Sequence, residues 1–160
     1  MSELKIGDQA PDFTLPGNNR QTISLSDYIG KPLVLYFYPK DNTPGCTQES
    51  CDFRDNLAAF QKLGCAVIGI SKCSAKKHDH FAAKYDLNFP LASDENGDTC
   101  ERYGVWKGKS LYGRSFMGIE RSTFLIDKDG KIAAIWRKVK VKGHVEEVKN
   151  ALEELKKKAA

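Results

Sequence analysis

The chain has 160 residues, with 25 lysines and arginines against 21 aspartates and glutamates, which gives a formal net charge of +4. This length favours one domain with a sizeable core, and we expect a single domain over residues 1–160. The charge is small and no basic stripe carries interleaved aromatic residues, so the sequence argues against a nucleic-acid-binding protein.

The sequence also gives an expectation about the cellular compartment. No charged-then-apolar leader opens the chain, and no apolar run approaches the length of a membrane span. The five cysteines are an odd number without the spacing of a disulfide framework, which favours a reducing compartment. We therefore expect a cytoplasmic protein in which cysteine pairs are catalytic and transient.

Two short extended segments begin the chain. They cover residues 12–15 and 22–25 and flank the turn Gly17-Asn18-Asn19, so this region is predicted to form an N-terminal hairpin. The next element is the apolar run from Leu33 to Tyr38, which is typical of a strand buried on both faces.

A helix is predicted to follow this strand. Pro39 ends the strand, residues 41–43 offer side-chain oxygens for a turn and an N-cap, and Pro44 stands where the first helical residue would lie. The helix should therefore begin near Thr43, and Gly64 is a plausible C-cap for its other end.

Cys46 falls in the first turn of this helix, where unpaired backbone N–H groups and the helix dipole favour an anion. A free cysteine titrates near about 8.5, and a helix N-terminus is one of the settings that lowers this pKa. The position predicts a reactive thiolate. The alternative is a small buried hydrophobic residue, which is the commoner role of a single helical cysteine.

A second cysteine, Cys51, lies about 140° round the helix axis from Cys46. Cys46 shares an apolar stripe with Phe53, Leu57 and Phe60, so we expect Cys46 to face the sheet and Cys51 to face away from it. A regular helix separates Cα atoms five residues apart by more than about 8 Å, whereas a disulfide needs roughly 4.4–6.8 Å. A disulfide between the two cysteines would therefore require the first turns to unwind.

The middle of the chain continues the alternation of strands and helices. Residues 65–71 are predicted to form a second buried strand, and Ser74 is expected to cap the next helix. Residues 87–91 look extended, and residues 94–98 form a turn before a short helix through Tyr103.

The last third contains a glycine-rich stretch and two further strands. Residues 104–120 are predicted to be either a mobile loop with binding contacts or a structural surface loop. Strands over residues 122–127 and 131–139 are joined by the turn Lys128-Asp129-Gly130, and a helix begins near Val145. This order predicts an α/β fold of thioredoxin-like type, with a mixed central sheet, helices on both faces and an N-terminal hairpin extension.

Three stretches together resemble the peroxiredoxins, specifically the branch of peroxiredoxin Q and bacterioferritin comigratory protein. They are the PxxxTxxC spacing of Pro39, Thr43 and Cys46 with Cys51 five residues further on, the string GDQAPDFTLP at residues 7–16, and GIERSTFLID at residues 118–127. The resemblance spans nearly the whole chain. It implies the same fold and a thiol peroxidase that reduces hydrogen peroxide and organic hydroperoxides.

The chemistry assigns roles to the two cysteines. A thiolate that attacks a peroxide becomes a sulfenic acid, which condenses with a second thiol to a disulfide. Cys46 has the attacking position and Cys51 the resolving one. Some relatives carry the resolving cysteine at the position of Ala82, and its absence here supports Cys51. Of the other cysteines, Cys73 is a possible spare thiol because it follows the carboxyl end of a strand.

Four other residues are candidates for the site. Thr43 offers a hydroxyl for binding the peroxide, with a plain N-cap as the alternative role. The cation beside the thiolate could be Arg54, Arg102, Arg114 or Arg121, and residue types alone do not choose among them. The resemblance implies Arg121, and it also implies that Pro39 shields Cys46. Glu49 is expected to orient the arginine, or else to be an ordinary exposed helix residue.

The resemblance predicts the partners of the protein, and the absence of several binding motifs bears on metals and cofactors. The resemblance points to thioredoxin as the reductant, with glutaredoxin or glutathione as another route, and an intrachain disulfide predicts a monomer. No CxxC pair, phosphate loop, haem attachment or dinucleotide fingerprint is present, so we expect no metal and no cofactor. The alternative function is a peroxide sensor that transfers its disulfide to a protein partner.

Overall fold

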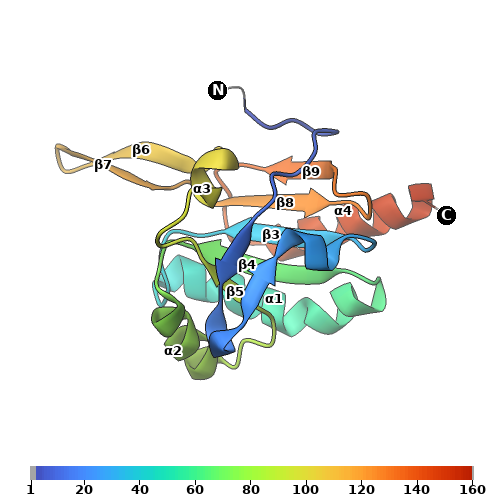
Figure 1. The fold of residues 1–160 in the computed structure, drawn as a ribbon, viewed down its shortest axis with the longest axis horizontal. Coiled ribbons are helices and arrows are strands. Elements are labelled where there is room, and N and C mark those ends of the chain that lie inside the picture. Colours follow the sequence, from blue (N-terminus) through green and yellow to red (C-terminus); the bar gives the residue numbers. More distant parts are fainter. Residues whose placement is uncertain (1–2, 160) are drawn as a thin grey trace.

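A five-stranded mixed sheet in the order β5-β4-β3-β8-β9 forms the centre of the computed structural model, which describes residues 3–159 (Figure 1). The strands are β1 (Thr14–Pro16), β2 (Thr22–Ser24), β3 (Leu33–Phe37), β4 (Ala66–Ser71), β5 (Leu91–Ser93), β6 (Trp106–Leu111), β7 (Arg114–Ile119), β8 (Ser122–Ile126) and β9 (Ile132–Trp136). The α-helices are α1 (Pro44–Lys62), α2 (Ala75–Tyr85), α3 (Thr99–Arg102) and α4 (His144–Ala159), and two 3₁₀ turns are η1 (Asn18–Arg20) and η2 (Leu25–Tyr28).

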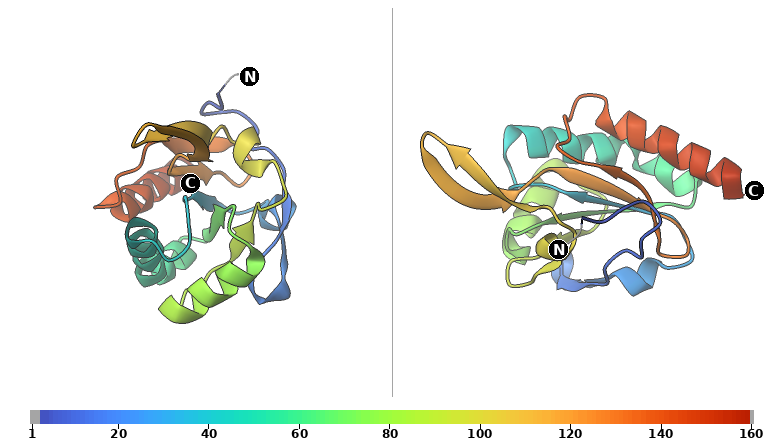
Figure 2. Two further views of the ribbon diagram at one scale, coloured as in Figure 1. Left: turned by 90° about the vertical axis from the view of Figure 1, so that its left-hand side faces the viewer. Right: turned by 90° about the horizontal axis from the view of Figure 1, so that it is seen from above.

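The two faces of the sheet are covered differently. Helices α1 and α4 pack side by side on one face, whereas the N-terminal segment and α3 cover the other (Figure 2, right). Strand β3 supplies both cores, because its side chains alternate: Val34 and Tyr36 lie in the core under α1, and Leu35 and Phe37 lie in the opposite core. Helix α2 lies beside β5, at one edge of the sheet.

Most of the predicted elements are confirmed. The N-terminal hairpin forms between β1 and β2, and the thioredoxin-like α/β fold is as expected. Helix α1 begins at Pro44 with Thr43 at its N-cap, and Ser74 accepts a hydrogen bond from the backbone of Lys77 at the start of α2. Strands β8 and β9 form the predicted hairpin, although β9 ends at Trp136, three residues earlier than expected.

One prediction is wrong. The glycine-rich residues 104–120 are not a loop, because β6 and β7 form an antiparallel hairpin that projects from the body of the protein (Figure 1). Tyr112 and Gly113 form its turn with φ of 52° and 76°, a conformation that glycine adopts freely. Within residues 87–91, which were expected to be extended, strand β5 begins at Leu91, and the Pro90 carbonyl before it accepts a hydrogen bond from the backbone of Gly69 in β4 at 3.1 Å.

Membrane insertion has no helical candidate in the described part of the chain. Among residues 3–159, no helix is both long and apolar enough to cross a bilayer.

Close packing between β3 and β4 depends on one glycine. Tyr36 pairs with Gly69 in the parallel register of β3 and β4, and its ring also stacks on Phe53 of α1 at a centroid separation of 4.6 Å. A Cβ atom at position 69 would lie 2.7 Å from the Tyr36 ring. Gly69 therefore gives Tyr36 the space it needs to pack beneath α1.

The substitution Gly69→Ala is expected to lower the free energy of unfolding by about 1–3 kcal/mol, because the added methyl group overpacks the core against Tyr36. The matched control is Gly108→Ala in β6, where a Cβ atom would meet nothing within 4 Å. Urea unfolding of the reduced proteins measures both changes. Equal stability of the two variants would contradict the packing argument.

Candidate active site

Cys46 lies in the first turn of α1, on the face that packs against the sheet. Its side chain is 1% exposed, and it belongs to the core that contains Phe53 and Leu57. The backbone of Thr43 has the extended conformation of an N-cap, and its carbonyl accepts the first helical hydrogen bond from Thr47 at 2.8 Å. The unpaired backbone N–H groups of this first turn belong to Cys46 and its neighbours in the chain, which is the setting predicted for an activated thiol.

Arg121 is the cation that the fold brings to Cys46. Its Nη2 donates a hydrogen bond to the Cys46 Sγ at 3.2 Å, and its Nη1 donates to Glu49 Oε1 at 2.7 Å. Arg121 immediately precedes β8, and Ser122 pairs with Phe37 at the end of β3, so the sheet places the guanidinium beside the start of α1. The other candidate arginines have different positions: Arg54 and Arg102 pair with aspartates, and Arg114 lies in β7.

A glycine makes the approach of Arg121 possible. A Cβ atom at Gly45 would lie 3.1 Å from Arg121 Nη2, so the guanidinium rests against the bare backbone just before Cys46. Glycine is a poor helix former, at a cost of about 1 kcal/mol relative to alanine. Its presence in the first turn of a helix is the sequence signal for this close contact, which is not among the predictions above.

Glu49 is fully buried, so its alternative role as an exposed helix residue is wrong. Oε1 binds Arg121, whereas the buried Oε2 has no hydrogen-bond partner within the described residues. Burial raises the pKa of Glu49 to about 7, although the neighbouring Arg121 opposes this shift. The carboxyl group therefore takes up or releases a proton near neutral pH while it holds the arginine.

Thr43 and Pro39 lie in the segment between β3 and α1. The Thr43 hydroxyl donates to the Lys40 carbonyl at 2.9 Å and makes no capping bond, so the predicted side-chain cap is absent although the residue occupies the N-cap position. Pro39 is half-buried and lines a cavity of about 390 Å³ whose apolar wall includes Phe116, Met117 and Ile119 of β7. Pro39 and Lys40, which lie between β3 and α1, form one side of this cavity, and its lining also includes Lys72, Lys77 and Lys109 but not Cys46.

The remaining cysteines differ in accessibility. Cys51 is partly exposed on α1, and burial raises the pKa of its thiol. Cys65 and Cys100 are buried, and burial raises the pKa of Cys65 to about 12 and that of Cys100 further. Cys73 is partly exposed and its Sγ accepts a hydrogen bond from the backbone N–H of Asp41 at 3.4 Å. Because Cys46 and Cys51 both belong to the continuous helix α1, they are free thiols here.

Two buried polar contacts around this site were not predicted from the sequence. Tyr36 and Ser50 share a hydrogen bond of 2.8 Å that ties the second turn of α1 to the sheet. His144, at the start of α4, lies 2.7 Å from the Thr123 hydroxyl, and burial together with Arg121 lowers its pKa to about 4. A serine on the apolar face of a predicted helix was the only sequence signal for the first contact.

Comparison with known proteins places these features in a family. Residues 6–135 match the AhpC/TSA family. The chain is 50% identical over 155 residues to the protein called peroxiredoxin Bcp of Bacillus subtilis, covering 97% of this chain and 99% of that protein.

Solved structures give the same result. A cysteine-to-serine mutant of Xylella fastidiosa PrxQ superposes with a TM-score of 0.90 at 43% identity over the full length of both chains. The Xanthomonas campestris bacterioferritin comigratory protein superposes with a TM-score of 0.86 at 43% identity, covering 90% of this chain and 92% of that one. The structure of that protein was described in terms of its alkyl peroxide reduction activity.

The titration of Glu49 predicts a specific pH dependence of stability. The native pKa is raised from 4.5 to about 7, so between these pH values the unfolded carboxyl group has lost its proton and the native one retains it. The wild-type protein should therefore lose stability relative to Glu49→Gln as pH rises through this window, on the order of 1 kcal/mol per pH unit. Urea unfolding of both reduced proteins at several pH values measures the difference.

The comparison with Glu49→Gln isolates this one group. His144, whose lowered pKa makes stability rise with pH between about 4 and 6.5, is present in both proteins and cancels in the difference. A difference that stays constant with pH would contradict the raised pKa of Glu49.

Proposed function

Because the chain belongs to the AhpC/TSA family and is a thiol peroxidase of the peroxiredoxin type, we propose that Cys46 attacks the hydroperoxide and Cys51 resolves the product. The observation that carries this proposal is the Arg121 guanidinium at 3.2 Å from the sulfur of a thiol buried in a helix N-terminus. A guanidinium stabilises negative charge on the attacking sulfur and on the oxygen that leaves.

The first step consumes one hydroperoxide molecule. The Cys46 thiolate attacks the terminal oxygen, the S–O bond forms as the O–O bond breaks, and the alkoxide or hydroxide takes a proton to leave as alcohol or water. Arg121 and the backbone N–H groups of the first turn supply donors for the leaving oxygen. Thr43 belongs to this group through its hydroxyl, after a rotation away from the Lys40 carbonyl.

The second step forms a disulfide. The Cys51 thiol attacks the sulfur of the Cys46 sulfenic acid, the S–S bond forms, and water leaves. Both residues lie in α1, so its first two turns unwind for the sulfur atoms to meet. Cys51 is partly exposed, which makes its thiol accessible once the helix opens.

The proposal also assigns roles to Pro39, Glu49 and the cavity beside Pro39. Pro39 shields Cys46 from bulk water, and Glu49 fixes the guanidinium through Oε1. The apolar cavity wall formed by Phe116, Met117 and Ile119 suits the alkyl part of an organic hydroperoxide. The enzyme needs no cofactor, because the two thiols carry the electrons.

The proposal also covers the reductant, the oligomeric state and the cellular compartment. A dithiol protein such as thioredoxin, or else glutaredoxin, exchanges with the Cys46–Cys51 disulfide and returns both thiols. Because the disulfide lies within one chain, a monomer is sufficient. The proposal further includes a cytoplasmic location and a single domain. The family resemblance supports thioredoxin, and the pair of cysteines in one helix supports the monomer.

The cycle is tested by mapping the cysteines after one equivalent of hydrogen peroxide. Reduced wild-type protein should lose two hydrogens at Cys46 and Cys51, and Cys46→Ser should lose none, as peptide mass spectrometry after alkylation would show. Cys100→Ser is the control, since this buried thiol should take no part. Equal oxidation of Cys46 and Cys100 in the wild type would refute the proposed role of Cys46. A sulfenic acid on Cys46 with Cys51 still free would refute resolution by Cys51.

Arg121→Lys should lower kcat/KM for hydrogen peroxide by about 10²-fold or more, because lysine lacks the planar fork whose two nitrogens hold the Cys46 sulfur and Glu49 in this geometry. The assay couples turnover to thioredoxin and thioredoxin reductase. Arg114→Lys, in the projecting hairpin, is the matched control and should retain wild-type activity. Rapid oxidation of the wild type without turnover in this assay would favour the peroxide sensor over the peroxidase.

A further inference from the structure

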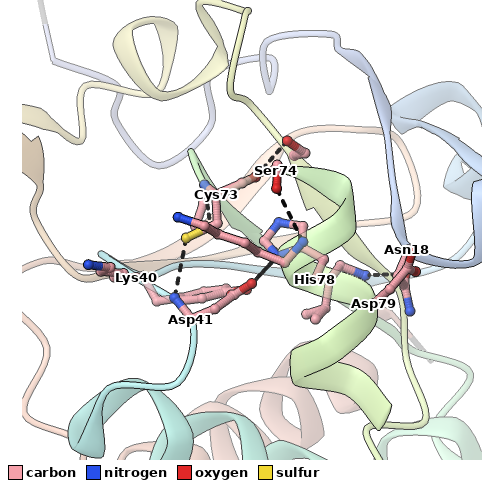
Figure 3. Close-up of polar contacts among 12 residues, drawn as sticks. Asn18, Lys40, Asp41, Cys73, Ser74, His78 and Asp79 are labelled. Carbon is pink, nitrogen blue, oxygen red and sulfur yellow. Dashed lines mark hydrogen bonds and ion pairs between the residues drawn. The ribbon is translucent and has the colours of Figure 1, made fainter. Parts of the chain in front are cut away.

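A second buried polar cluster lies beside the loop that leads into α1 (Figure 3). His78 of α2 is 0% exposed, and its Nδ1 lies 2.7 Å from Asp41 Oδ2. The hydroxyl of Tyr38 donates to Asp41 Oδ1 at 2.6 Å, and His78 Nε2 lies 3.0 Å from the carbonyl of Ala92 in β5. The cluster therefore joins the end of β3, the loop, α2 and β5.

The hydrogen atoms of this cluster can be placed from its acceptors. A carbonyl oxygen only accepts, so His78 Nε2 carries a hydrogen that it donates to Ala92. One further proton lies between His78 Nδ1 and Asp41 Oδ2. With the Tyr38 hydroxyl on Oδ1, both carboxyl oxygens of Asp41 and both ring nitrogens of His78 have partners. A complete buried network of this kind fixes its members in one arrangement.

The neighbouring loop residue is also held by α2. Asn42 has a left-handed backbone with φ of 63°, and its Oδ1 accepts hydrogen bonds from the Tyr85 hydroxyl at 3.0 Å and from Lys84 Nζ at 3.3 Å. The backbone N–H of Asp41 donates to Cys73, just before α2 (Figure 3). Two successive residues of the loop are thus attached to α2 and its N-terminal flank, and Cys46 follows four residues after Asn42.

We propose that Asp41 and His78 are positioning residues of the peroxidase reaction, which hold the loop between β3 and α1 on α2 so that the first turn of α1 forms around Cys46. The proposal rests on the peroxidase cycle proposed above. We call Asp41, Asn42, His78 and Tyr85 the loop anchor.

The loop anchor marks one boundary of the segment that unwinds. On its other side, Phe53 packs between Tyr36 and the rest of the core and holds the remaining turns of α1 in place. The residues that change conformation therefore lie between Asn42 and Phe53, and they contain both Cys46 and Cys51. When the disulfide is reduced, the anchored loop returns the chain to the same helix start.

Loss of the anchor should affect the two chemical steps unequally. Peroxide attack needs Cys46, the backbone donors and Arg121 in one geometry, and a displacement of about 1 Å in such a site costs as much as 10²-fold in rate. Disulfide formation takes place in the unwound segment and does not need that geometry. A loosened loop therefore slows oxidation of Cys46 and leaves its resolution by Cys51 unchanged or faster.

The experiment compares Asp41→Ala with Asp41→Asn. The alanine removes both contacts of the carboxyl group, whereas the asparagine can still accept from Tyr38 and donate from its amide to Nδ1 of a neutral His78. The rate of Cys46 oxidation and the rate of disulfide formation are measured separately, by rapid quenching with an alkylator and peptide mass spectrometry. Asp79→Ala is the matched control, because this aspartate of α2 binds the backbone of Asn19 instead of the loop.

The expected result is a loss of about tenfold or more in the second-order rate of Cys46 oxidation for Asp41→Ala, with rescue to near the wild-type rate in Asp41→Asn. The rate of disulfide formation should be unchanged or higher in either variant. Asp79→Ala should keep both rates. A wild-type rate of Cys46 oxidation in Asp41→Ala, with only a lower melting temperature, would overturn the proposal and leave the peroxidase cycle intact.

A milder variant covers the case in which Asp41→Ala does not fold. Asn42→Gly removes the acceptor of Tyr85 and Lys84 while glycine adopts the left-handed conformation without strain. It should slow Cys46 oxidation by about threefold and leave disulfide formation unchanged, and unchanged Cys46 oxidation would overturn the proposal. Failure of the peroxidase cycle itself is distinguishable, because in that case the wild type would show no preferential oxidation of Cys46.

Discussion

The contact of one guanidinium with two residues of α1 is the interaction on which the candidate active site depends. Arg121 binds Cys46 through Nη2 and Glu49 through Nη1, so the planar group spans one turn of the helix. The antiparallel register of β3 and β8 sets where Arg121 starts, and a shift of one residue would turn its side chain to the opposite face of the sheet. The sheet and the helix therefore fix the environment of the thiol together.

Burial makes the contact between Arg121 and Glu49 costly to break. Glu49 has no exposed surface and one carboxyl oxygen without a partner among the described residues, so its charge is held only by Arg121. Breaking such a buried pair is costly, because it leaves an uncompensated charge in the core. Unwinding of the first turns also breaks the hydrogen bond between Tyr36 and Ser50. The helix start is therefore held by few but specific contacts, which is compatible with the unwinding that the proposed Cys46–Cys51 disulfide requires.

Local sequence signals were sufficient for most elements but not for the glycine-rich hairpin. The start of α1 at Pro44 and the cap of α2 at Ser74 follow from residues within one helical turn, and such short-range chemistry is present in the chain before it folds. In residues 104–120, the glycines favour a loop when only local signals are considered. Those residues form β6 and β7 because their backbones pair with each other across the turn at Tyr112 and Gly113.

The sequence by itself determined the fold class, the placement of Cys46 at a helix start and, through resemblance, the choice of Arg121. Only the tertiary structure decided that Glu49 is buried with a pKa of about 7, that Tyr36 binds Ser50, and that Asp41 is held by His78. The physical reason is distance along the chain. Caps and apolar stripes involve residues a few positions apart, whereas these contacts join residues that only the packing of α1 and α2 against the sheet brings together.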